Sequence, residues 1–295
     1  MIATPSRRIF VAGATATAVA APAVAASDRF GEIEARVGGR LGVAALDVES
    51  GARLDHRAGE RFPMCSTFKV MAVAALLSRV DRGADQLDRR VRYTAADLLD
   101  YAPVTRARVG EGGMPLADLC AAAIELSDNT AANLILDCIG GPAGWTSFAR
   151  VAGDAVSRLD RTEPTLNTAE AGDPRDTTTP LAMLGALRMV VLGKLLSTGS
   201  RERLAGWMGA CQTGAHRLRS GLPAAWRVGD KTGSGAHGTA NDIAVAWTPQ
   251  GAIVITAYLT GAERAAPADL DAAYADIGRA VVQAFRPEAS AAAHG

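Results

Sequence analysis

The sequence DIAVAWTPQGAIVITAYL, residues 242–259, contains two strand-like runs on either side of a Pro-Gln-Gly turn. A third strand-like run, residues 226–232, precedes them. Near the other end of the chain, residues 41–48 are apolar like a buried strand, and a second extended segment follows at residues 52–57. The pattern therefore predicts strands near both ends of the chain.

Between the two strand groups, apolar residues recur at helical spacing. The spacing predicts helices over residues 66–83, 115–126, 129–139, 180–196 and 200–208, and an amphipathic helix over 269–285 closes the chain. Residues 158–179 lack this periodicity and contain two prolines and several charges. They are predicted to form a long structured loop, and loops of that length inside a compact domain are usually functional.

The simplest packing of these elements joins the strands from both chain ends in one antiparallel sheet. We therefore predict an α/β (α+β) fold in which this sheet is flanked by helices from both chain ends and an all-helical domain is inserted. The sheet domain is expected to comprise residues 27–62 and 210–288, and the helical domain residues 63–209. A ligand site is expected in the cleft between them. Residues 289–295 are expected to be a disordered tail.

Residues 1–26 have the plan of an export signal. Arg7 and Arg8 precede a weakly apolar stretch, and small residues follow at 23–25. Paired arginines before a stretch of low hydrophobicity resemble a twin-arginine signal, and the alternative is an ordinary Sec signal. Either route predicts an exported protein, periplasmic or secreted, that is cleaved near Ala25.

Composition narrows the classes of function. The chain of 295 residues has no net formal charge and only 5% aromatic residues, which gives no support for nucleic-acid binding. Its four cysteines and four histidines form no metal-ligand pattern. No apolar stretch of membrane-spanning length follows the signal. We expect no metal, no cofactor and no membrane association in the mature protein, which we expect to be a monomer.

Lysine is rare, because only Lys69, Lys194 and Lys231 occur among 31 basic residues. Arginine stays protonated, whereas a partly buried lysine can lose its proton and act as a base. Ser66 lies one helical turn before Lys69, so a desolvated Lys69 could activate it as a nucleophile. For this pair alone, an N-cap serine with a solvated lysine is the simpler interpretation.

Two further groups lie on elements that would face the cleft. Ser-Asp-Asn at residues 127–129 lies between two predicted helices, and Lys-Thr-Gly at 231–233 ends a predicted strand. Taken singly, helix capping explains the first group and an edge lysine before a turn explains the second. Together with Ser66 and Lys69, in this order, they resemble the S-x-x-K, S-D-N and K-T-G motifs of class A β-lactamases and penicillin-binding proteins.

The long loop resembles that of the class A β-lactamases in particular. Its segment EPTLN, residues 163–167, is similar to the E-x-x-L-N segment of that class, and Arg161 and Asp176 match the ion pair that closes this loop in the family. The resemblance extends from Cys65 to Trp247. It implies a serine acyl-transfer hydrolase that acts on penicillins and cephalosporins and so confers antibiotic resistance.

The resemblance also implies catalytic roles. Ser66 attacks the lactam carbonyl, while the backbone N–H groups of Ser66 and Ser234 hold the oxyanion. Either Lys69 or Glu163, acting through a water, takes the serine proton, and Ser127 passes a proton to the lactam nitrogen. Glu163 then activates the water that hydrolyses the acyl-enzyme.

The resemblance further implies a set of residues that contact substrate. They are Tyr101, Asn129, Asn167, Arg217, Lys231, Thr232, Gly233 and Ser234. Lys231 and Thr232 are expected to bind the substrate carboxylate, with Arg217 as an additional cation. Tyr101 resembles an aromatic wall of the cleft. Asn129 is expected to brace Lys69.

Glu163 separates the hydrolase from its alternatives. Without a deacylating water, the same serine chemistry stops at a stable acyl adduct, as in a DD-peptidase of the penicillin-binding type or a non-turnover β-lactam sensor. Two disulfides of the family are not expected. The partner position of Cys65 is Gly235, and that of Cys120 is Val73.

Overall fold

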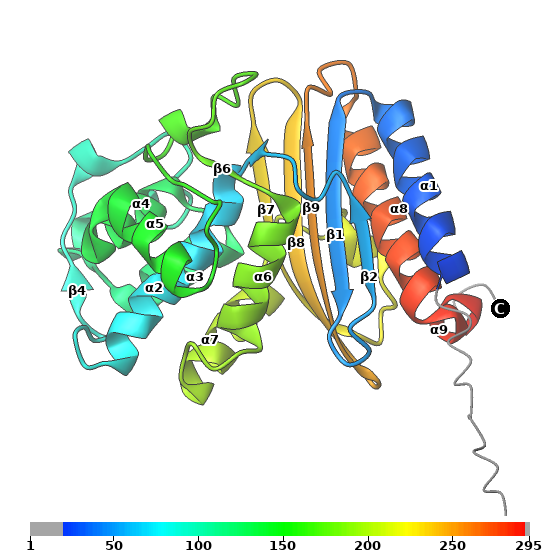
Figure 1. The fold of residues 1–295 in the computed structure, drawn as a ribbon. Coiled ribbons are helices and arrows are strands. Elements are labelled where there is room, and N and C mark those ends of the chain that lie inside the picture. Colours follow the sequence, from blue (N-terminus) through cyan, green and yellow to red (C-terminus); the bar gives the residue numbers. More distant parts are fainter. Residues whose placement is uncertain (1–19, 293–295) are drawn as a thin grey trace, which may run out of the picture.

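A five-stranded antiparallel sheet lies at the centre of the computed structural model, which describes residues 20–292 and the side chains of 28–289. The strand order is β2-β1-β9-β8-β7 (Figure 1). The strands are β1 Arg40–Asp47, β2 Arg53–His56, β7 Arg227–Gly235, β8 Thr239–Thr248 and β9 Gly251–Thr260. Val43 of β1 lies opposite Ala257 of β9, so the two ends of the chain meet in the sheet. The predicted sheet of strands from both chain ends is confirmed.

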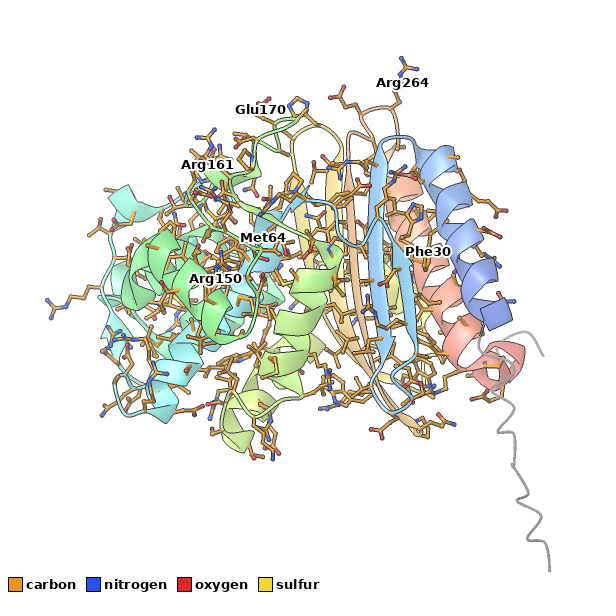
Figure 2. All side chains as sticks on the ribbon, viewed as in Figure 1. Phe30, Met64, Arg150, Arg161, Glu170 and Arg264 are labelled. Atoms are coloured by element: carbon orange, nitrogen blue, oxygen red, sulfur yellow. The ribbon has the colours of Figure 1, made fainter. Side chains whose placement is uncertain are left out.

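Both faces of the sheet are covered by helices. Strand β9 is buried from Ala252 to Leu259, and for this reason its sequence is apolar on both faces, with Thr256 as a buried polar exception, instead of alternating. Helices α1 (Ala20–Val37) and α8 (Pro267–Phe285) cover one face, and α6 (Pro180–Val191) packs against β1 and β9 on the other (Figure 1). Phe30 of α1 is completely buried beside the sheet (Figure 2).

Helix α2 (Phe68–Asp81) is the centre of the helical part and is buried from Phe68 to Ser78. The helices around it are α3 Leu116–Glu125, α4 Asn129–Ile139, α5 Gly141–Val151 and α7 Thr198–Gly209. Short 3₁₀ helices are η1 Cys65–Thr67, η2 Ala95–Asp97, η3 Arg106–Glu111, η4 Thr165–Asn167 and η5 Leu218–Gly221. Met64, fully buried, lies between this part and the sheet (Figure 2).

Two short strand pairs accompany the helices. Strand β3 (Phe62–Pro63) pairs with β6 (Thr177–Thr178), and β4 (Arg90–Val91) pairs with β5 (Met114–Pro115). The β3–β6 pair fastens the end of the long loop to the segment that leads to Ser66. The division of the chain into domains at residues 63 and 209 remains a prediction.

Two helices differ from the sequence prediction. Helix α5 was not expected, because Gly140 ends α4 and the new helix begins at the next residue, Gly141, with Pro142 in its first turn, at a position that tolerates proline. Helix α6 ends at Val191, earlier than the predicted residue 196.

The chain termini also differ from the prediction. Residues 289–295 were expected to be a disordered tail, but helix α9 covers Pro287–Ala292; residues 293–295 lie outside the described part. Residues 1–19 of the expected export signal are likewise outside it, and α1 begins at Ala20, within that signal. Within residues 20–292, no helix has the length and apolar character needed to cross a membrane.

A buried ion pair holds the C-terminal segment on the sheet. The Arg286 guanidinium donates to both carboxylate oxygens of Asp47, at 2.9 and 3.1 Å, and both side chains are almost completely buried. Burial alone would raise the pKa of Asp47, but the hydrogen bonds from Arg286 and Ser50 outweigh it, so this pKa is lowered. This anchor lies directly before α9 and ties the start of that helix to strand β1.

Replacing Arg286 with alanine is expected to lower the free energy of unfolding by about 3–5 kcal/mol, because it leaves a buried carboxylate without its charge partner. The matched control is Arg279→Ala, whose exposed pair with Asp276 should contribute at most about 1 kcal/mol. Denaturant unfolding measures the free energy of unfolding of both variants. A lowered carboxyl pKa stabilises the fold above about pH 4, so the difference between wild type and Arg286→Ala should shrink as pH falls below that value. An equal loss of unfolding free energy in Arg286→Ala and Arg279→Ala would contradict this account.

Candidate active site

A cleft of about 290 Å³ lies at the junction of the sheet and the helical part. The residues that line it are Ser66, Tyr101, Ser127, Asn129, Asn167, Thr213, Arg217, Thr232, Gly233 and Ser234. Lys69, Glu163 and Lys231 are buried next to these residues. The structure therefore brings together all the predicted site residues, which come from η1, α2, α4, η4, β7 and the loops between these elements.

Ser66, Lys69 and Glu163 form a tight cluster. The Ser66 hydroxyl donates to Glu163 Oε1 at 3.1 Å, and Lys69 Nζ lies 3.1 Å from the same oxygen. The side chains of Lys69 and Glu163 are completely buried. One carboxylate oxygen is thus shared by a hydroxyl and an ammonium group, and a proton can move among all three.

The environment of Lys69 favours proton transfer. Burial lowers the pKa of Lys69, while the charge of Glu163 and its hydrogen bond act in the opposite direction; the net effect is a lowered pKa. Asn129 Oδ1 accepts a hydrogen bond from Lys69 at 2.6 Å, so the expected brace is in place. A lysine held this way can both give and take a proton.

Ser127 connects the two buried lysines. Its hydroxyl accepts from Lys69 Nζ at 3.3 Å and from Lys231 Nζ at 3.0 Å. Burial lowers the pKa of Lys231 to about 8. Because both contacts are donated by lysines, the Ser127 proton stays available for a group in the cleft.

The loop that carries Glu163 is fixed at two places. Asn133 of α4 pairs with the Glu163 backbone, donating to its carbonyl at 2.9 Å and accepting from its N–H at 3.0 Å. Arg161 donates to the buried Asp176, which also accepts from the Arg161 backbone at 2.9 Å. Asn167 donates to Glu163 Oε2. The ion pair implied by the resemblance is present, and Figure 2 shows Arg161 on this loop.

Backbone geometry brings strand β7 close to the nucleophile. Cys65 and Ser127 have φ angles of +44° and +59°, which cost non-glycine residues about 1–3 kcal/mol each. A β-carbon on Gly233 would come within 2.9 Å of the Met64 carbonyl and 3.2 Å of the Ser66 nitrogen. Glycine is therefore required at 233 for the strand to lie against η1.

The far end of the cleft is cationic and rich in hydroxyl groups. Arg217 donates to the Ser234 hydroxyl at 3.1 Å and to the Gly233 carbonyl at 3.0 Å, and Asp271 holds its Nε at 3.1 Å. The Thr232 hydroxyl lies 2.5 Å from that of Thr213. This end suits an anionic group on a ligand.

Tyr101 lies at the rim of the cleft, with half of its surface exposed. Its carbonyl accepts from the Asn129 N–H at 3.0 Å, which ties the rim to the start of α4. The buried Asp128 caps α4 at the Ala131 N–H and also binds the Thr105 N–H, at 2.9 Å each. Helix capping, the simpler interpretation of this group, is therefore observed at Asp128, and it positions the neighbouring Ser127 and Asn129.

Two residues of the site, Asn133 and Thr213, were not predicted from the sequence. Asn133 follows Asn129 by one helical turn on the same face of α4, a spacing that could have indicated it. Thr213 lies outside every motif, in the segment after α7, and no sequence signal indicated it.

All four cysteines, Cys65, Cys120, Cys138 and Cys211, are free thiols. A β-carbon at Gly235 would lie 2.7 Å from Cys65 Sγ, so the two positions are adjacent, but glycine has no thiol with which to form a bridge. Among the described side chains, no group of three or more His, Cys, Asp or Glu residues is placed to hold a metal ion.

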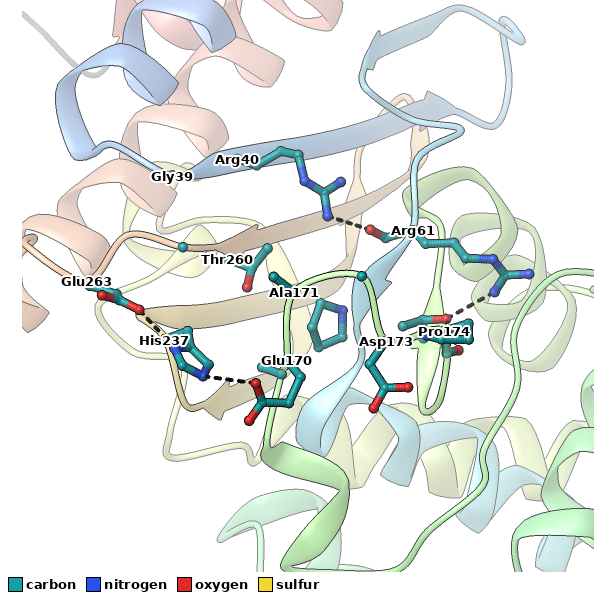
Figure 3. Close-up of a pocket in the computed structure, with 15 residues that line it drawn as sticks. Gly39, Arg40, Arg61, Glu170, Ala171, Asp173, Pro174, His237, Thr260 and Glu263 are labelled. Atoms are coloured by element: carbon teal, nitrogen blue, oxygen red, sulfur yellow. Dashed lines mark hydrogen bonds and ion pairs between the residues drawn. The ribbon is translucent and has the colours of Figure 1, made fainter.

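A second and larger cavity, of about 510 Å³, lies on the other side of the long loop (Figure 3). His237 at its edge contacts Glu263 at 2.8 Å and Glu170 of the loop at 3.7 Å, and the hydrogen bond to Glu263 raises the pKa of His237. None of the clustered catalytic candidates lines it. The chemistry is therefore assigned to the smaller cleft.

Comparison with known proteins agrees with this assignment. Residues 25–285 match the family model described as the "Beta-lactamase enzyme family". The chain is 50% identical to β-lactamase AST-1 of Nocardia asteroides over 272 residues, which is 92% of this chain and 85% of that protein. It is 52% identical to β-lactamase L2 of Stenotrophomonas maltophilia, with 82% of each chain covered.

Solved structures give the same result. An ancestral (GNCA) class A β-lactamase superposes with a TM-score of 0.86 at 57% identity, covering 88% of this chain and 100% of that one. A putative class A β-lactamase, PenP of Rhodopseudomonas palustris, superposes with a TM-score of 0.87 at 53% identity, with the same coverage. The chain therefore belongs to the β-lactamase enzyme family and, within it, to the class A serine β-lactamases.

Proposed function

We propose that Ser66 of this class A β-lactamase opens the lactam ring of penicillins and cephalosporins and that Glu163 completes the hydrolysis, which confers antibiotic resistance. One observation carries the proposal: the Ser66 hydroxyl and the Lys69 amine meet at one oxygen of Glu163 at the foot of a cationic cleft. A nucleophile, a proton carrier and a second base are thereby within reach of a single bound carbonyl.

In acylation, Ser66 Oγ forms a bond to the lactam carbonyl and gives its proton to Glu163 Oε1. The oxyanion is held by the N–H groups of Ser66 and Ser234. Lys69 gives a proton to Ser127 as Ser127 protonates the lactam nitrogen, and the C–N bond breaks. Glu163 returns its proton to Lys69, so the cluster regains its starting charge.

In deacylation, Glu163 removes a proton from a water that Asn167 helps to position. The resulting hydroxide attacks the ester carbonyl, and Ser66 leaves with that proton. Atoms balance for the addition of one water to the lactam. Burial of Glu163 beside Lys69 keeps the base close to the ester and away from bulk solvent.

The substrate carboxylate is bound at the far end of the cleft by Lys231, Thr232 and Ser234. Arg217 supports Ser234 and adds positive charge. Asn129 and Tyr101 contact the rest of the substrate. No cofactor takes part in any of these steps.

The activity should depend on the charge of Lys231. Its lowered pKa, about 8, means that kcat/KM for an anionic penicillin should fall as pH rises through that value, because the neutral amine binds a carboxylate poorly. In Lys231→Arg the cation is fixed, so the alkaline limb should move above pH 10, whatever the absolute rate. Rate profiles from pH 6 to 10 test this. An identical midpoint in both proteins would show that another group titrates.

Turnover distinguishes this function from its alternatives. Wild-type protein mixed with a thousandfold excess of a chromogenic cephalosporin is expected to hydrolyse all of it. A DD-peptidase or a β-lactam sensor would release only about one equivalent of chromophore and stop. That outcome would replace the hydrolase with a covalent trap.

We also propose that the protein acts after export, as a monomer, outside the cytoplasmic membrane. The paired arginines at 7 and 8 support this, since export would bring the enzyme to the compartment that β-lactams reach first. Detection of a mature chain that starts near Ser27 in a periplasmic or culture fraction would test it.

A further inference from the structure

Thr213 makes one contact that the reaction scheme does not use. Its hydroxyl lies 2.5 Å from the hydroxyl of Thr232, and both residues line the cleft at its cationic end. Thr232 itself is buried, so its hydroxyl has few partners to choose from. The direction of this hydrogen bond therefore affects what Thr232 can offer a ligand.

A hydroxyl group has one proton to donate and two lone pairs to accept with. To bind a substrate carboxylate, Thr232 must donate its proton to that carboxylate. The 2.5 Å contact must then be donated by Thr213. Cys211 Sγ, 3.4 Å from the Thr213 oxygen, can act as a weak donor behind it. The hydrogen bonds then all run in one direction. The Cys211 thiol donates to Thr213, Thr213 donates to Thr232, and Thr232 donates to the carboxylate, so each hydrogen bond polarises the next.

The segment that carries Thr213 is held rigidly on both sides. The Gln212 N–H donates to the Glu125 carbonyl of α3 at 2.9 Å. On the other side, a β-carbon on Gly214 would lie only 1.8 Å from Asp230 Oδ2, so this backbone sits directly on strand β7. Thr213 thus has little freedom to turn away from Thr232.

We propose that Thr213 is a positioning residue for substrate specificity: its hydroxyl donates to Thr232 and so directs the Thr232 proton toward the carboxylate of the β-lactam. The inference rests on the proposed function, because it requires a carboxylate-bearing substrate at this end of the cleft. Its effect should be confined to substrates that carry that carboxylate.

The test compares wild type, Thr213→Val and Thr213→Ser on a cephalosporin and on the methyl ester of the same compound. Valine keeps the shape and removes the hydroxyl, so kcat/KM for the free acid is expected to fall about fivefold, mainly through KM. Serine should restore it. For the ester, wild type and Thr213→Val should differ by less than twofold.

Equal losses on acid and ester, or no rescue by serine, would overturn the proposal, because both indicate a general structural effect of residue 213. An unchanged kcat/KM for the acid in Thr213→Val would overturn it as well. If wild type hydrolyses neither compound, the proposed function itself fails, which is a different result. A thermal unfolding midpoint for each variant confirms that folded proteins are compared.

Discussion

Glu163→Gln is expected to form the acyl-enzyme and then to release it about 10²–10⁴ times more slowly than wild type, the contribution typical of a general base. Glutamine keeps the shape of the side chain but cannot take a proton from water. Acylation should continue, because Lys69 Nζ and the Ser66 hydroxyl both contact the same oxygen of residue 163 and therefore lie close to each other. The Glu163 charge raises the pKa of Lys69, so its removal lets burial lower that pKa further, toward a neutral amine that can accept the Ser66 proton.

The matched control is Glu170→Gln. Glu170 lies on the same loop but is largely exposed, and its pairing with His237 at 3.7 Å is a surface contact (Figure 3). Its kcat should stay within about twofold of wild type. Stopped-flow measurement of chromophore release separates a burst from the steady state. A Glu163→Gln enzyme that turns over within tenfold of wild type, without a burst, would exclude Glu163 as the deacylation base.

Lys69→Arg is expected to reduce the acylation rate about 10²–10⁴-fold. The scheme requires residue 69 to donate a proton and regain it, and arginine does not release its proton. The larger guanidinium must also fit a site in which the side chain of residue 69 is completely buried. Fluorescence or chromophore change in a single-turnover experiment measures acylation directly.

Lys194→Arg is the control for that variant, because Lys194 is exposed and far from any motif. Its acylation rate should equal that of wild type. If Lys69→Arg acylates as fast as Lys194→Arg, a fixed cation suffices at residue 69 and the proton cycle through Lys69 is wrong.

Much of the fold could be predicted from the sequence because its central strands are unambiguous. Strands β1 and β9 are buried on both faces, so their sequences are predominantly apolar without alternation, and they are too short for membrane helices. Helix α5 could not be predicted, since Gly140 and Gly141 indicate the end of a helix and Gly141 is also the first residue of the next one. The C-terminal helix α9 could not be predicted either, because its short Ala/Ser-rich sequence lacks an apolar period and the Arg286–Asp47 contact beside it joins residues 239 apart.

The site was predictable only as separate motifs. Ser66 and Glu163 are 97 residues apart and Ser127 and Lys231 are 104 apart, so spacing alone could not bring them together. The predicted elements placed three of the motifs near one cleft, but the roles of these residues and the inclusion of Glu163 were expected only from the resemblance to a known family. Thr213 could not be predicted at all, because its proximity to Thr232 follows from how the segment after α7 packs on β7.

The most direct test of the central claim is the intact mass of wild type and Glu163→Gln, quenched with acid after brief exposure to excess benzylpenicillin. Addition of the opened lactam to Ser66 loses no atoms, so the account predicts that Glu163→Gln gains the full mass of one penicillin while wild type stays at its free mass. Ser66→Ala should gain nothing. A wild type that carries the same lasting adduct as Glu163→Gln would contradict the account, because it would show that Glu163 does not complete hydrolysis.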